Sequence, residues 1–183
     1  RFGIKQVMLI SMLAWVLRFG LFAFGDPVQG LWMIILSCIV YGMAFDFFNI
    51  SGSLFVETHA DAKNRSSAQG MFMMMTNGVG AILGSFTSGW AIDRFFTKSF
   101  TNTTELASFL QTDVANPKML EFVKGQGNSV TTDGLLQNVI MMKDWHTIWL
   151  AFAIYSLVIA IAFAIMFKHE HNPNADVVDN LSH

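Results

Sequence analysis

Four long apolar segments constrain this chain of 183 residues more than any other feature of its sequence. A helix needs about 20 mostly apolar residues to cross a membrane core of about 30 Å. The segments are residues 7–24, 31–56, 68–92 and 147–167. Charged residues make up only 13% of the chain, against about 25% in soluble domains. We therefore predict an all-α fold, a polytopic bundle of four transmembrane helices.

The segments between the apolar stretches divide the chain into parts. Residues 1–95 hold the first three predicted helices, 146–168 the last one, and 169–183 a polar tail. Residues 96–145 form a polar insertion outside the bilayer, where we expect short helices. One would be capped by Thr103 or Thr104 and run through Gln111, and another would start at Asn116-Pro117 and stop at Gly125.

The loops also predict an orientation. Positively charged residues mark the cytoplasmic side of short loops. They gather at the N-terminus, at residues 63–65 and at Lys168, whereas the turn at residues 25–30 has none. Four lysines of the insertion weaken this pattern, although long segments obey the rule less strictly. We expect both ends in the cytoplasm. The chain opens without Met, as a piece cut from a longer chain would.

The second apolar segment has one polar, aromatic side. At helical spacing, Tyr41 and Phe45 share a stripe, and Asp46 and Asn49 share the neighbouring one. The opposite side is apolar throughout, which is typical of a helix that lines a cavity. Aromatic residues at this spacing also occur as ordinary packing. Beside an amide and a carboxylate, however, Tyr41 and Phe45 would suit a planar, polar solute.

Asp46 lies deep inside that segment. A carboxylate in the middle of a membrane costs at least about 2.5–3.5 kcal/mol unless it is paired, protonated or beside water. One interpretation is a proton-binding group, because burial favours the protonated carboxyl. The other is an ion pair with Arg18 of the first segment that holds two helices together.

Other signals are weaker. Gly80 and Gly84 of the third segment favour close helix contact, and Asn77 there fits either packing or binding. His169 and His171 suit a solvated tail better than a metal site, and we predict no metal and no cofactor. A net charge of −2 without a basic cluster gives no indication of nucleic acid as a partner.

The stretch from Tyr41 to Glu57, YGMAFDFFNISGSLFVE, closely resembles a late helix of bacterial nucleoside permeases. These are nucleoside:proton symporters of the major facilitator superfamily. The opening RFGIK is similar to the end of that superfamily's loop signature. RFGLF at Arg18 and NGVG at Asn77 fit the same family. The resemblance covers the four segments but not residues 97–144.

This resemblance implies that the segments are the last four helices of a twelve-helix fold in the bacterial inner membrane. It implies proton-coupled import of nucleosides, with the missing N-terminal helices and the lipid bilayer as partners. Tyr41 and Phe45 would bind the nucleoside, and Asp46 would bind substrate or couple protons. The alternative is a related transporter of another small polar solute, such as a sugar. An enzyme or a structural subunit fits less well, because the segments hold one Asp and no His in their interiors.

Overall fold

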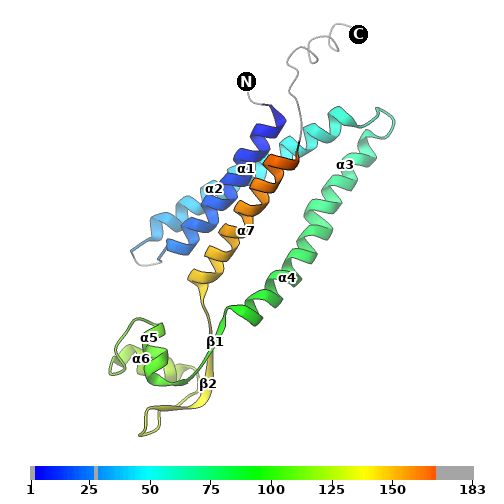
Figure 1. The fold of residues 1–183 in the computed structure, drawn as a ribbon. Helices are drawn as coiled ribbons and strands as arrows, with labels where there is room; N and C mark the ends of the chain where they lie inside the picture. The colour runs from blue at the N-terminus through cyan, green and yellow to red at the C-terminus, as the bar shows by residue number, and fades with distance from the viewer. Residues whose placement is uncertain (1–2, 27–28, 168–183) are drawn as a thin grey trace. The chain divides into compact units, whose positions relative to one another are not determined.

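The computed structural model describes residues 3–26 and 29–167. These residues divide into two compact units, one formed by residues 88–144 and the other by the rest. In chain order the elements are α1 (Ile4–Phe24), α2 (Leu31–His59), α3 (Arg65–Met73), the π-helix η1 (Met74–Val79), α4 (Gly80–Phe95), β1 (Thr97–Asn102), α5 (Thr103–Phe109), α6 (Pro117–Gly125), β2 (Leu135–Lys143) and α7 (Trp145–Met166) (Figure 1).

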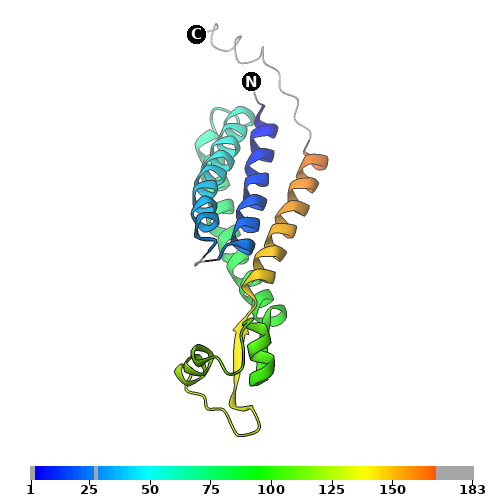
Figure 2. The ribbon, with the colours of Figure 1, turned by 90° about the vertical axis from the view of Figure 1, so that its left-hand side faces the viewer.

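Three helices of the first unit confirm three of the predicted apolar segments. Within the described residues, α1, α2 and α7 are the helices long and apolar enough to cross a membrane. Helix α1 lies between α2 and α7 and packs against both (Figure 1, Figure 2). The ends of α1 and α2 extend a few residues beyond the predicted segments, as apolar pattern alone fixes helix ends poorly.

Small polar side chains join these helices. Ser11 Oγ of α1 donates a hydrogen bond to the carbonyl of Ala44 in α2 at 2.8 Å. Ser37 Oγ of α2 donates to the carbonyl of Arg18 in α1 at 3.3 Å. Small residues let two helix backbones approach closely, and their hydroxyls then find carbonyl partners on the neighbouring helix. Hydrogen bonds from serine side chains to backbone carbonyls of the neighbouring helix therefore join α1 and α2.

The third predicted segment, residues 68–92, lies in a continuous helical run that has three parts. Helices α3 and α4 are joined by η1, whose hydrogen bonds span five residues in place of four. A regular α-helical register therefore does not continue from Asn77 into α4, whereas Gly80 and Gly84 remain one turn apart on the same side of α4. A Cβ at Gly80 would lie 2.9 Å from the Met75 carbonyl oxygen, so the π-helix itself requires glycine there.

At the ends of the predicted turn at residues 25–30, Gly30 N–H donates a hydrogen bond to the Asp26 carbonyl at 2.8 Å. Several residues of the sequence analysis lie outside the described residues, namely Arg1, Pro27, Lys168, His169 and His171.

The described residues are mostly helical, and the unit formed by residues 88–144 adds a two-stranded sheet that the prediction of an all-α fold did not include. Strands β1 and β2 pair antiparallel, with Thr97 opposite Lys143 and Phe100 opposite Ile140. Apolar residues alternate poorly in these strands, and their pairing joins segments about forty residues apart in the sequence. Sequence periodicity therefore gave no sign of the sheet.

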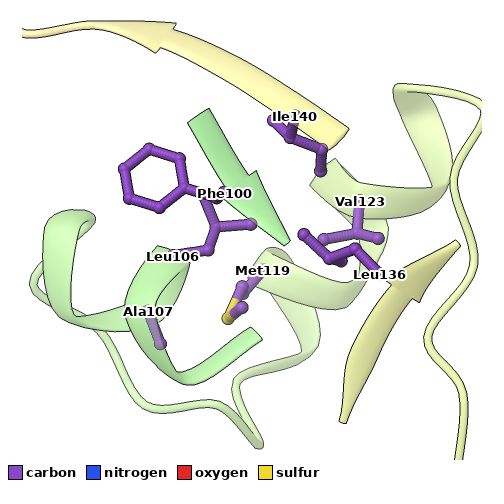
Figure 3. Close-up of a cluster of buried hydrophobic side chains, with 7 residues drawn as sticks. All are labelled: Phe100, Leu106, Ala107, Met119, Val123, Leu136 and Ile140. Carbon is purple, nitrogen blue, oxygen red and sulfur yellow. The ribbon is translucent and has the colours of Figure 1, made fainter. Parts of the chain in front are cut away.

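The two short helices predicted in the insertion are confirmed as α5 and α6. Each is capped by an asparagine: the Asn102 side chain accepts from Thr104 N–H, and the Asn116 side chain accepts from Lys118 N–H. The cap of α5 is thus Asn102 and not Thr103 or Thr104. Helices and strands enclose one apolar core (Figure 3), whose buried residues are Phe100, Leu106, Ala107, Met119, Val123, Leu136 and Ile140.

Candidate functional site

Helix α2 carries the three residues that the sequence analysis selected. Tyr41 is 38% exposed and Phe45 39% exposed, and Asp46 is exposed as well. Tyr41 and Phe45 lie one helical turn apart on the same side of α2. Asp46 follows Phe45 directly and so projects about 100° further round the helix axis. The helix therefore presents the aromatic pair and the carboxylate on adjoining sides.

Tyr41 belongs to an aromatic cluster that bridges α1 and α2. Its ring meets Trp15 of α1 edge-on at 5.4 Å between centroids and lies 5.9 Å from the ring of Phe45. Aromatic pairs at these separations favour such edge-on and tilted arrangements. The cluster fixes the direction in which Phe45 projects from α2.

Arg18 of α1 completes this cluster from its other side. Its guanidinium lies 4.0 Å from the centroid of the Tyr41 ring and 5.0 Å from that of Trp15. The Phe19 and Phe22 rings are each 5.7 Å away. Within the described residues, the buried Nε of Arg18 has no hydrogen-bond partner. Aromatic faces therefore stabilise this cation.

The ion pair between Arg18 and Asp46, one of the two interpretations of Asp46, does not form. Among residues 3–26 and 29–167, the ion pairs join Arg65 to Glu57, Lys98 to Asp144 and Lys143 to Asp93. No hydrogen bond within these residues reaches the Asp46 carboxylate either. Because Arg18 turns to the ring of Tyr41, the carboxylate stays available for a proton or a solute.

A pocket of about 220 Å³ opens between α1, α2 and η1, beside this cluster. Four apolar side chains and three polar ones line it: Met12, Trp15, Phe45, Phe48, Asn49, Thr76 and Asn77. Mostly apolar walls with a few polar groups are typical of sites that bind small molecules. The pocket lies within the first unit, so its walls come from one compact body.

The polar groups of the pocket keep hydrogen-bonding capacity for a ligand. Asn49 Nδ2 donates to the Phe45 carbonyl at 2.9 Å, and Thr76 Oγ1 donates to the Phe72 carbonyl at 2.8 Å. Asn77 Nδ2 contacts only the weakly accepting Met73 sulfur, at 3.5 Å. The amide oxygens and the remaining N–H groups are left to a solute. Among the described residues, no cluster of His, Cys, Asp or Glu could hold a metal ion.

The structure places the three selected residues differently with respect to the pocket. Phe45 lines it, Tyr41 lies behind Phe45 in the aromatic cluster, and Asp46 lies outside the lining. Sequence reasoning gave no role to Trp15 or Thr76, and it left Asn77 open. Asn49 had a usable signal, since it follows Phe45 by one helical turn. Trp15 and Thr76 had none, because their place depends on how α1 and η1 pack.

Three helices of the described residues, α1, α2 and α7, are long and apolar enough to cross a membrane, which is typical of a multi-pass membrane protein. A family model described as "Nucleoside H+ symporter" matches residues 1–172. The chain belongs to that family, and the family resemblance inferred from its sequence is confirmed.

Individual relatives agree with this assignment. The chain is 47% identical to the xanthosine permease of Escherichia coli (strain K12) over 174 residues, which cover 94% of this chain and 32% of that protein. It is 44% identical to the nucleoside permease NupG of the same organism, covering 93% of this chain and 31% of that one. A crystal structure of nucleoside transporter NupG matches with a TM-score of 0.63 at 44% identity, covering 93% of this chain and 32% of the other. The chain thus spans about a third of the length of these relatives.

Proposed function

We propose that this chain forms part of a transporter that imports nucleosides across the bacterial inner membrane, driven by protons. The observation that carries the proposal is the pocket between α1, α2 and η1, in a chain of the nucleoside H+ symporter family. Its rings match the flat faces of a nucleobase, and its amides match polar edges. Two relatives of this chain are named as permeases of nucleosides.

Each of the three selected residues then has a role. Phe45 packs against the solute inside the pocket. Tyr41 orients Phe45 through the aromatic cluster and offers its hydroxyl. Asp46 couples protons or binds the solute, since no ion pair within the described residues occupies its exposed carboxylate. Its position next to Phe45 in α2 joins proton binding to solute binding on one helix.

The arrangement of the chain in the membrane is part of the proposal. The run from α3 through α4 spans the bilayer as α1, α2 and α7 do, which gives four spans. These would be the last four helices of a twelve-helix major facilitator fold, completed by the other helices of the same transporter. Both ends of the chain then lie in the cytoplasm, and the insertion lies on the outer side. Rocking of the two halves would expose the site to each side in turn.

The first experiment measures uptake of labelled uridine by cells that lack their own nucleoside permeases and express the full-length transporter containing this chain. Uptake is compared with and without a proton gradient, and in the Phe45→Ala and Asp46→Asn variants. Phe47→Ala is the matched control, since Phe47 is on the same helix and is also 39% exposed, but does not line the pocket.

We expect gradient-driven uptake that falls by about tenfold or more in Phe45→Ala, is lost in Asp46→Asn and persists in Phe47→Ala. Uptake that ignores the gradient and survives Asp46→Asn would exclude the proton-coupling role. A panel of sugars is added in excess in parallel. Competition by sugars but not by nucleosides would assign the site to another solute.

A further inference from the structure

Two primary amides enter the pocket from different helices. Asn49 comes from α2 and Asn77 from η1, and Thr76 stands next to Asn77. Asn49 donates one N–H to the Phe45 carbonyl, and Asn77 donates one to the Met73 sulfur, which is a weak acceptor. Each side chain therefore retains a carbonyl acceptor and at least one N–H donor for a ligand.

The π-helix η1 supplies two consecutive residues of the pocket lining, as α2 does with Phe48 and Asn49. Thr76 and Asn77 both line the pocket from within η1. Single π-turns inside α-helices occur frequently at functional sites. Here the turn is specified locally, since Gly80 leaves room for the Met75 carbonyl.

We infer that Asn49 and Asn77 bind the hydrogen-bonding edge of the nucleobase, while Trp15, Phe45 and Phe48 pack against its faces. This assignment rests on the proposed function and names the part of the solute that the pocket recognises. A primary amide holds a donor and an acceptor side by side, as does the edge of a base. A ribose ring carries hydroxyls around its rim, and four apolar walls would leave several of them without partners.

The inference has a specific consequence for selectivity. The two amides recognise the carbonyl or amino group that projects from the base, so they set which nucleosides are preferred. The aromatic walls, in contrast, accept any base, because each base has an apolar face. Replacing the amides by a side chain of similar size without polar groups should equalise the affinities for nucleosides whose bases differ only along that hydrogen-bonding edge.

The test uses the full-length transporter and its Asn49→Leu and Asn77→Leu variants. Two probes compete with labelled uridine: unlabelled uridine and the pyrimidinone riboside, which lacks both the oxygen at position 4 and the hydrogen on N3. A third probe, 2′-deoxyuridine, reports on the sugar. Asn138→Leu is the matched control, because Asn138 is exposed and belongs to the other unit. For a variant without measurable uptake, the same inhibitor ratios come from ligand-induced shifts in melting temperature.

We expect uridine to bind at least about tenfold more weakly to each Leu variant, with the affinity for the pyrimidinone riboside unchanged. Asn138→Leu should keep the original ratio. The inference is overturned if both variants keep the uridine preference, or if only the ratio of uridine to 2′-deoxyuridine changes, which would assign the amides to the sugar. A well-expressed parent that binds no nucleoside would instead overturn the proposed function, and the two failures are thus distinguishable.

Discussion

The two units of this chain bury opposite kinds of side chain. In residues 88–144, the buried core consists mostly of large apolar residues such as Leu106, Met119 and Val123. In α1, α2 and α7, every buried residue apart from Met8 and Ile148 is Ala, Ser or Gly. Large apolar residues of these helices, such as Leu17, Ile39 and Ile161, are exposed.

The difference reflects the solvent for which each part is built. Water drives large apolar side chains inward, because burying their surface is favourable. Lipid is as apolar as a leucine side chain, so helices in a bilayer associate through close packing of small residues and hydrogen bonds between helices. The first unit follows the rule for lipid and residues 88–144 follow the rule for water. The comparison supports the proposed bilayer location of the first unit and the proposed aqueous location of the apolar core formed by residues 100–140.

The largest expected effect on stability comes from shortening a buried side chain in the core of residues 88–144. Leu106 is 0% exposed, whereas Leu83 of α4 is 60% exposed. Leu106→Ala should lower the free energy of unfolding of residues 88–144 by about 2–5 kcal/mol, through lost burial and a cavity. Leu83→Ala should lower the stability of its unit by less than about 1 kcal/mol. Hydrogen exchange of the full-length transporter in lipid nanodiscs measures both losses of stability. Equal losses in the two variants would contradict the difference in packing between the two units.

The next effect tests the small-residue packing of the first unit. A methyl group added at Gly52 of α2 would overlap the ring of Phe72, while one at Gly42 of the same helix would meet nothing within 4 Å. Gly52→Ala should therefore destabilise the packing of α2 on α3 by about 1–3 kcal/mol. The melting temperature of the detergent-solubilised transporter is the measurement. A decrease of similar size in Gly42→Ala would show that helix packing is not what Gly52 supports.

The smallest effect concerns the partners of one positively charged side chain in each unit. Arg18 lies against the aromatic rings of the first unit, whereas Lys98 pairs with Asp144 at 3.0 Å in the other unit. Arg18→Met should weaken uridine binding by about 3- to 30-fold, because Tyr41 loses the cation over its ring. Lys98→Met should cost at most about 1 kcal/mol of stability in a salt-dependent way, and leave uridine affinity unchanged. An Arg18→Met variant with normal uridine affinity would show that the guanidinium does not contribute to uridine binding.

The sequence predicted helices α1, α2 and α7 because a run of apolar residues is a local property. The short helices α5 and α6 were predicted from local signals at Thr103 or Thr104 and at Asn116-Pro117, although the structure places the cap of α5 at Asn102. The candidate site was predicted less completely. Phe45 lines the pocket, but the binding and coupling roles of Tyr41, Phe45 and Asp46 stay predictions. Helical spacing identifies the side of α2 on which they lie, and it does not tell which neighbouring helix that side meets.

Composition and apolar length by themselves determined that this chain supplies membrane helices, and the residues from Tyr41 to Glu57 determined its family. The tertiary structure alone decided that Arg18 contacts Tyr41 in place of Asp46. It also decided that β1 pairs with β2, and that Thr76 and Asn77 of η1 line one pocket with Asn49. Each of these depends on contacts between residues far apart in the chain or on an altered helical register. Hydrophobic periodicity reports only how a residue relates to its near neighbours in sequence.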